Sequence, residues 1–247
     1  MELKLDLHIH SEASPDGRMR VEEITELAKT RGLQGVAICD HNVLYRPRED
    51  TDTHGILVIP GIEFSTDCGH LLGLFLTEPL EGQDAESLIR GIHAQGGLAV
   101  LAHPFEHSAD AERFQKIVPL LDGMELWNGR ANRKFSDAND RARRFARENG
   151  LAGTGGSDAH LPREIGNGFV TVEVEEPSLQ AVKEALRRPG NPVSGQNGRH
   201  WDAARSRRTR LSRTNAGLGS KLKWFAYAGK CLLEDLLHRP LRIKKGE

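Results

Sequence analysis

The chain has 247 residues and a formal net charge of −1, with 38% hydrophobic and 5% aromatic residues. This length and composition predict one globular domain with a full core and an appendage at most, and the low aromatic content argues against a surface built for stacking bases. No stretch approaches the roughly 18 apolar residues of a spanning helix, and the N-terminus lacks the apolar core of a signal peptide. Because Cys39, Cys68 and Cys231 are widely spaced and odd in number, they are typical of reduced thiols, and we expect a cytoplasmic protein.

Charge divides the chain into two parts. Residues 196–247 hold thirteen Lys or Arg against four Asp or Glu, which leaves 21 basic and 31 acidic residues in 1–195. An acidic body followed by a basic tail indicates two functional regions. We therefore expect one domain over residues 1–195 and a basic extension over 196–247.

Short apolar runs alternate with stretches of helical spacing along the acidic body. The predicted strands cover residues 3–5, 35–39, 56–59, 70–76, 98–101, 123–127, 151–154, 169–174 and 192–193. The predicted helices cover residues 21–29, 85–95, 109–121, 135–148 and 179–186. Such alternation is typical of βα units in a parallel sheet, and six or seven units in about 195 residues fit a compact barrel. The predicted fold class is α/β, a (β/α) barrel with a basic, partly helical C-terminal extension.

Side chains that can bind metals follow the carboxyl ends of these predicted strands. His8 and His10 lie two apart at the end of the first strand and project to the same side, and Asp16 can return to them across a Ser-Pro-Asp-Gly turn. The other strand ends carry His41, Glu63, His103, Asp158 and His160. In a parallel barrel these ends form one rim, where active sites lie. His70 begins its strand instead, and it reaches this rim if it and Glu63 flank a tight turn.

Two further residues near the rim could contribute to the metal site, one by orienting a ligand and the other as a substitute ligand. Asp40 is either a turn residue or a carboxylate that orients a ligand histidine, and we favour the second interpretation. His107 follows the His-Pro turn closely and is a substitute ligand to consider.

Four polar residues near the rim are candidates for contact with substrate. Arg18, Arg130 and Arg163 could each bind a phosphate bidentately or remain solvated surface residues. Arg163 ranks first because it follows Asp158 and His160 by only a few residues. Asn128 either contacts substrate or ends its strand.

The ordered set of motifs resembles the PHP superfamily, which is named after polymerase and histidinol phosphatase domains. The motifs are Asp-Leu-His-Ile-His (6–10), Ser-Pro-Asp-Gly (14–17), Ile-Cys-Asp-His-Asn (38–42), Gly-Ile-Glu (61–63), Gly-His-Leu-Leu-Gly-Leu (69–74), Ala-His-Pro (102–104) and Gly-Ser-Asp-Ala-His (156–160). The resemblance covers most of residues 1–175 and is greatest to the stand-alone metal-dependent phosphoesterases of the superfamily. It implies a distorted seven-fold β/α barrel, similar to a TIM barrel, that holds up to three divalent metals.

The resemblance also implies how the ligands divide among three ions. The implied sets are His8, His10 and Asp158 for the first ion, Glu63 as a bridge with His70 and His103 for the second, and Asp16, His41 and His160 for the third. Mixed imidazole and carboxylate ligands suit Mn²⁺, Zn²⁺ or Fe²⁺ better than Mg²⁺ or Ca²⁺. Because no cysteine belongs to the set, a closed structural zinc site is not expected.

These features predict an enzyme, a metal-dependent hydrolase of phosphoric esters. A cluster of divalent ions with surplus positive charge attracts a phosphate, and a metal-bound hydroxide would attack the phosphorus. The expected partner is a small phosphorylated substrate, a nucleotide or a short nucleic acid among the candidates. Two alternatives stay open: a catalytically silent PHP module that serves as a metal-binding regulatory subunit, and an amidohydrolase that acts on C–N bonds. The near-complete ligand set argues against the first, and the third-metal set favours phosphate over the second.

The basic tail contains two different segments. Residues 196–215 are polar and rich in arginine, which predicts a linker or arm. Residues 218–237 then repeat leucine and phenylalanine at helical spacing beside lysines, which predicts a basic amphipathic helix. The simplest interpretation is that this helix packs on the barrel or on a second copy in a homo-oligomer. The alternatives are an arm that attracts nucleic acid and a helix that lies on an anionic membrane surface.

Overall fold

A computed structural model describes residues 1–46, 51–108, 110–214 and 216–237 of the chain. Its strands are β1 (Glu2–Ile9), β2 (Gly35–His41), β3 (Leu57–Thr66), β4 (Gly69–Leu74), β5 (Leu98–Leu101), β6 (Gly123–Asn128), β7 (Ala152–Gly156), β8 (Gly168–Glu173) and β9 (Val193–Gly195). Its α-helices are α1 (Val21–Thr30), α2 (Ala85–Ala94), α3 (Glu112–Gln115), α4 (Ala138–Glu148), α5 (Leu179–Leu186), α6 (His200–Arg213) and α7 (Leu218–Leu237). Short 3₁₀ turns occupy η1 (Val118–Leu120), η2 (Ala131–Arg133) and η3 (Pro162–Glu164).

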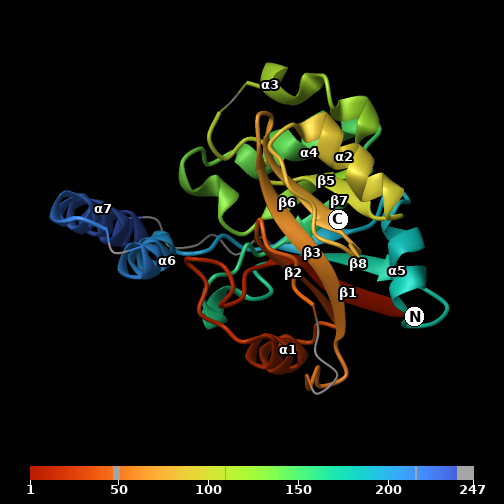
Figure 1. The fold of residues 1–247 in the computed structure, drawn as a ribbon, viewed down its shortest axis with the longest axis horizontal. Helices are drawn as coiled ribbons and strands as arrows, with labels where there is room; N and C mark the ends of the chain where they lie inside the picture. Colours follow the sequence, from red (N-terminus) through yellow and green to blue (C-terminus); the bar gives the residue numbers. More distant parts are fainter. Residues whose placement is uncertain (47–50, 109, 215, 238–247) are drawn as a thin grey trace.

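The strands form a nearly closed barrel, as the sequence predicts (Figure 1). The order around the sheet is β7-β6-β5-β4-β3-β2-β1-β8-β9. The N-terminal half of β1 pairs with β8, whereas its carboxyl end is joined to the segment after β7, where His8 O accepts from Asp158 N at 2.8 Å and His10 N donates to Ala159 O at 2.9 Å. Strands β1 to β7 therefore form a ring of seven strands, and β8 pairs with β1 where the ring closes between β1 and β7.

The expectation of an all-parallel sheet is wrong for two strands. β4 runs antiparallel to both β3 and β5, and β8 runs antiparallel to β1 and β9. The β3–β4 connection is a tight turn that ends at Gly69, whose φ of +118° is open to glycine alone. Because the turn reverses the chain, the start of β4 lies at the same rim as the end of β3, and Ser65 pairs with His70.

The barrel interior is a continuous apolar core that α5 closes at the end away from this rim. Leu3, Leu5 and Val172 belong to one buried cluster with Val182 and Leu186 of α5. Helices α2 and α4 cover another side of the sheet and pack on Phe64 and neighbouring apolar residues, while α1 packs on β2 (Figure 1). The predicted helix over 109–121 is shorter in the structure, where α3 and η1 occupy its described part.

The arginine-rich stretch after β9 is a helix, which corrects the expectation of a linker or arm. Helix α6 buries Ala204 and Ser206 against the barrel and α7, and α7 packs on it through Trp224, Ala228 and Cys231. The two helices project from one side of the barrel (Figure 1).

Much of the predicted apolar stripe of α7 faces solvent. The exposed side chains are Leu218, Leu222, Phe225, Leu232, Leu233, Leu236 and Leu237. A homo-oligomer through this helix stays a prediction. None of the helices in the described part of the chain has the length and apolarity needed to cross a membrane.

Candidate metal centre

All nine predicted ligands gather at the rim formed by the carboxyl ends of β1, β2, β3, β5 and β7 and the start of β4. Glu63 lies at the middle of the cluster and is 2% exposed. Its Oε1 is 2.7 Å from His70 Nδ1 and 3.1 Å from His103 Nε2, and its Oε2 is 2.7 Å from His41 Nδ1. The antiparallel β4 explains why His70, at the start of its strand, reaches the same point as residues at strand ends.

Two histidines of the first strand point their Nε2 atoms into the cluster. His8 Nδ1 lies 3.0 Å from Glu125 Oε1, and a carboxylate only accepts, so Nδ1 carries the proton. The Ser14 hydroxyl donates to Asp40 Oδ1 at 2.6 Å, so its oxygen accepts from His10 Nδ1 at 3.0 Å. Both rings therefore present the Nε2 lone pair to the interior when they are neutral.

The two Nε2 atoms face each other at 3.1 Å, and both rings are fully buried. Two lone pairs at this distance repel, and a shared cation removes the repulsion. Without one, a proton is needed, and attraction by Glu125 and Asp158 outweighs burial and holds the pKa of His8 well above its usual value. The arrangement of His8 and His10 thus fits a bound metal ion.

A third ligand histidine is oriented by a buried carboxylate. His103 Nδ1 lies 3.2 Å from Glu106 Oε2, which leaves Nε2 to face Glu63. Glu106 also accepts from Arg133 at 2.9 Å. Ligand histidines in metal sites commonly donate their second N–H in this way, because the bond fixes the tautomer and the ring.

The backbone is strained at two of the candidate ligands. His103 has φ of +27° and Asp158 has φ of +54°, both in the left-handed region that side chains other than glycine rarely occupy. Strain of this kind clusters at functional sites. It brings Asp158 Oδ1 to 3.3 Å from His10 Nε2 and 3.9 Å from His8 Nε2.

A further carboxylate and two histidines form the outer part of the cluster. Asp16 Oδ1 lies 3.5 Å from His41 Nε2 and 3.4 Å from His160 Nε2. Burial alone would lower the pKa of His41, but Asp16 and Glu63 raise it to about 10. Burial would raise the pKa of Asp16, but its contacts with His160 and His41 hold this pKa well below its usual range. The Ser-Pro-Asp-Gly turn thus returns Asp16 to the cluster as the sequence predicts.

Three buried polar atoms of the cluster lack hydrogen-bond partners among the described residues, namely Asp16 Oδ1, Glu63 Oε2 and His70 Nδ1. Glu63 Oε2 lies 2.7 Å from His41 Nδ1, and His70 Nδ1 lies 2.7 Å from Glu63 Oε1. Buried ligand atoms that converge without hydrogen-bond partners fit a shared cation. Four sets of three donors lie within 4.8 Å of one another, and they are His8-His10-Glu63, Glu63-His70-His103, His8-His103-Asp158 and His10-His41-His160.

The carboxylate expected to orient a histidine and two of the arginines expected to bind phosphate have different surroundings. Asp40 is fully buried and accepts from Ser11 N at 2.8 Å and from the hydroxyls of Ser11 and Ser14 at 2.6 Å, so it reaches the cluster only through Ser14. Arg163 pairs with Asp202 of α6, which neutralises the charge that a phosphate would need, and it does not join the cluster. Arg18 is exposed and lines a cavity beside the rim.

Three other candidates lie outside the ligand set. Arg130 is buried and forms a bidentate pair with Glu164 at 2.8 and 2.6 Å, so it is not available to substrate. Asn128 donates to Glu125 Oε2 at 3.0 Å and thereby helps to hold the partner of His8. His107 is largely exposed and approaches only Glu106, which corrects its interpretation as a substitute ligand.

The sequence reasoning missed the two glutamates that orient ligands. Glu125 and Glu106 are buried, and Glu125 is an isolated acidic residue in an otherwise apolar strand. That isolation is the signal that could have identified it. The β6–β7 ladder shifts register next to Glu125, as the β1–β2 ladder does next to His8. Such irregularities redirect side chains near functional sites.

Comparison with known proteins supports the same family in sequence and in fold. The family model described as PHP-associated matches residues 136–189. The uncharacterized protein MJ1587 of Methanocaldococcus jannaschii is 34% identical over 140 residues, which cover 51% of this chain and 82% of MJ1587.

Two solved structures share the barrel. One is a two-domain protein from Bacteroides vulgatus that contains a predicted PHP-like metal-dependent phosphoesterase, with TM-score 0.66 and 23% identity over 86% of this chain and 70% of that one. The other is the lesion-specific endonuclease PfuEndoQ from Pyrococcus furiosus, with TM-score 0.60 and 22% identity over 81% of this chain and 60% of that one. A barrel with a histidine-rich rim of this design defines a PHP-type protein. The chain belongs to the PHP superfamily.

Proposed function

We propose that this protein is a metal-dependent phosphoesterase that hydrolyses a phosphate mono- or diester. The observation that carries the proposal is the convergence of six imidazoles and three carboxylates at one rim, where Asp16 Oδ1, Glu63 Oε2 and His70 Nδ1 lack hydrogen-bond partners among the described residues. The names of the PHP-like neighbours, a metal-dependent phosphoesterase and an endonuclease, support the same class of reaction.

The donor set suits two or three ions of Mn²⁺, Zn²⁺ or Fe²⁺. When bound, such ions lower the pKa of water and neutralise charge on a phosphoryl oxygen. The protein supplies the orientation: Glu125 and Ser14 fix the first-strand histidines, and Asp40 holds Ser14 in place. Arg18 follows Asp16 by two residues and is exposed, so it is the arginine that we propose for contact with the phosphate.

The test combines metal analysis with a substrate panel. We expect the purified protein to contain Mn, Zn or Fe, and the stripped protein to recover hydrolysis of p-nitrophenyl phosphate or bis(p-nitrophenyl) phosphate when metal is returned. Glu63→Gln should abolish this activity, whereas Glu26→Gln on the exposed side of α1 should not change it. Hydrolysis of amide substrates alone would support an amidohydrolase, and bound metal without any turnover would support a silent regulatory module; either result contradicts the proposal.

A further inference from the structure

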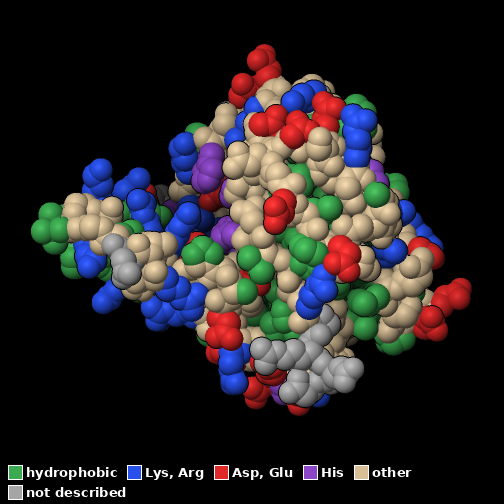
Figure 2. Space-filling model, viewed as in Figure 1, with side chains coloured by type: hydrophobic (Ala, Val, Ile, Leu, Met, Phe, Trp, Pro, Cys, Tyr) green, Lys and Arg blue, Asp and Glu red, His purple; other side chains and the backbone are tan. Residues whose placement is uncertain are grey.

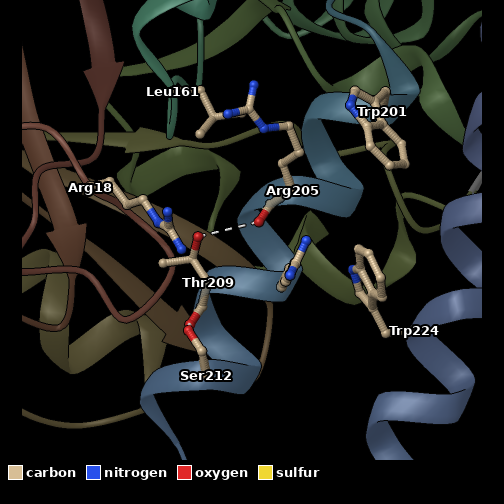
Figure 3. Close-up of a pocket in the computed structure, with 8 residues that line it drawn as sticks. Arg18, Leu161, Trp201, Arg205, Thr209, Ser212 and Trp224 are labelled. Carbon is tan, nitrogen blue, oxygen red and sulfur yellow. Dashed lines mark hydrogen bonds between the residues drawn. The ribbon is translucent and has the colours of Figure 1, made fainter.

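A cavity of about 470 Å³ lies between α6, α7 and the metal-site rim (Figure 3). Its walls include three arginines and two tryptophans, namely Arg18, Arg205, Arg208, Trp201 and Trp224. Leu161 completes the wall on the barrel side. The cavity therefore combines charge and aromatic surface from two separate parts of the chain.

The cavity adjoins the candidate metal centre. Arg18 follows Asp16 by two residues, and Leu161 directly follows His160. Helix α6 is fixed to this rim, because Arg213 donates to Ser14 O at 2.9 Å and Ser206 accepts from Arg130 at 3.2 Å. A ligand in the cavity is thus held beside the metal cluster by a rigid wall.

The cavity carries positive charge that the described residues leave unbalanced. No carboxylate lines it, and none of the described acidic residues lies within 4 Å of the guanidinium groups of Arg18, Arg205 or Arg208. Figure 2 shows Lys and Arg side chains gathered over α6 and α7, with histidine side chains nearby on the barrel. Unpaired guanidinium groups of this kind match phosphate oxygens in charge and in geometry.

The aromatic lining adds a preference for flat rings. Trp201 is half-buried and offers part of its ring, whereas Trp224 is 8% exposed and lies under Arg208, whose guanidinium is 5.4 Å from the centre of the Trp224 ring. The cavity holds two of the three tryptophans of the chain. The low overall aromatic content argues against base stacking, but the tertiary structure brings two of the tryptophans together at this cavity. Bases stack on tryptophan and on arginine planes with little dependence on sequence.

We propose that this cavity binds a nucleotide unit of single-stranded nucleic acid whose neighbouring phosphate lies at the metal centre. The inference rests on the proposed phosphoesterase function and names its substrate class. Because the cavity lies beside the cluster and not within it, one ligand that fills both must link an anionic ring-bearing unit to a second phosphate. A nucleic-acid strand has this repeat, whereas a free mononucleotide does not.

The test measures binding without hydrolysis. Full-length protein in EDTA is titrated into a fluorescein-labelled 12-nucleotide single strand, and anisotropy is followed between about 50 and 200 mM salt. We expect the Arg205→Gln/Arg208→Gln variant to bind at least about tenfold more weakly, with a salt slope reduced by about 1.4, since each lost phosphate contact contributes about 0.7. The matched control is Arg207→Gln/Arg210→Gln, which removes the same charge from the same helix outside the cavity and should bind within about threefold of the unmodified protein.

Two further measurements keep the proposal falsifiable. Arg18→Gln changes an exposed residue on the barrel side of the cavity, outside α6 and α7, and it should also weaken binding. Tryptophan fluorescence should be quenched by the oligonucleotide and not by inorganic polyphosphate. Equal affinities of the cavity and control variants would overturn the proposal. So would oligonucleotide binding that leaves tryptophan fluorescence unchanged and is no tighter than the binding of polyphosphate. In either case metal-dependent hydrolysis of bis(p-nitrophenyl) phosphate would still decide the proposed function separately.

Discussion

At the scale of single residues, the candidate metal centre is oriented by side chains outside the predicted ligand set. Glu125 accepts from His8 Nδ1 with one oxygen and from Asn128 and the His103 amide with the other. In Glu125→Gln, an amide that keeps the second oxygen's partners must turn its NH₂ toward His8, which moves the proton of this ring to Nε2. We expect metal affinity to fall by about 10- to 100-fold, as measured by metal content after equilibrium dialysis.

The control for this substitution is Glu26→Gln, which changes the same charge on an exposed face of α1. It should keep the metal content of the unmodified protein. If Glu125→Gln also keeps it while remaining folded, the tautomer of His8 is not set by Glu125.

At the scale of elements, Trp224 is the largest of the buried side chains through which α7 packs on α6. Trp224 is 8% exposed and donates from Nε1 to Ala204 O at 2.7 Å, whereas its neighbour Phe225 is 66% exposed. Truncation of a buried tryptophan costs about 3–5 kcal/mol, so Trp224→Ala should release α7 from α6. Amide hydrogen exchange should then rise across 218–237 and stay unchanged in β1 to β7. Phe225→Ala is the matched control and should leave exchange almost unaltered, and equal effects of the two would show that α7 is held elsewhere.

At the scale of the whole molecule, ligands from the full length of the barrel make its stability depend on metal and on pH. A ligand at 100 times its dissociation constant stabilises by about 2.7 kcal/mol, which corresponds to a rise in Tm of roughly 5–10 °C for a chain of this size. In the metal-free protein, Asp16 and Glu63 outweigh burial and raise the pKa of His41 to about 10. Protonated His41 therefore stabilises the fold fully only below its ordinary pKa of 6.5; this contribution declines above that pH and is lost as pH rises to about 10, and metal must displace this proton.

We therefore expect the rise in Tm on adding Mn²⁺ to stripped protein to be larger at pH 8 than at pH 6, because affinity increases about tenfold per pH unit for each proton released. Differential scanning calorimetry at the two pH values measures this. A rise that is equal at both, or absent at both, would contradict proton-linked metal binding at this rim.

The sequence by itself predicted the barrel and the side chains that meet at its rim. His8, Glu63 and Asp158 could be identified because each follows a short apolar strand, and the carboxyl ends of strands meet at one rim whatever the details of packing. This rule can be applied to the sequence because it needs only the end of each strand and the type of the residue that follows.

Only the tertiary structure decided strand direction, the partners of the ligands and the place of α6. The reversal of β4 depends on a turn at Gly69, and the roles of Glu125 and Arg163 depend on residues 117 and 39 positions away. Helix α6 is polar along most of its length, so its sequence resembles a linker until Asp202, Ser206 and Arg213 meet their partners on the barrel. Buried polar groups find their partners on distant parts of the chain. These pairs do not recur at a fixed spacing in the sequence, so the pattern of residues could not predict them.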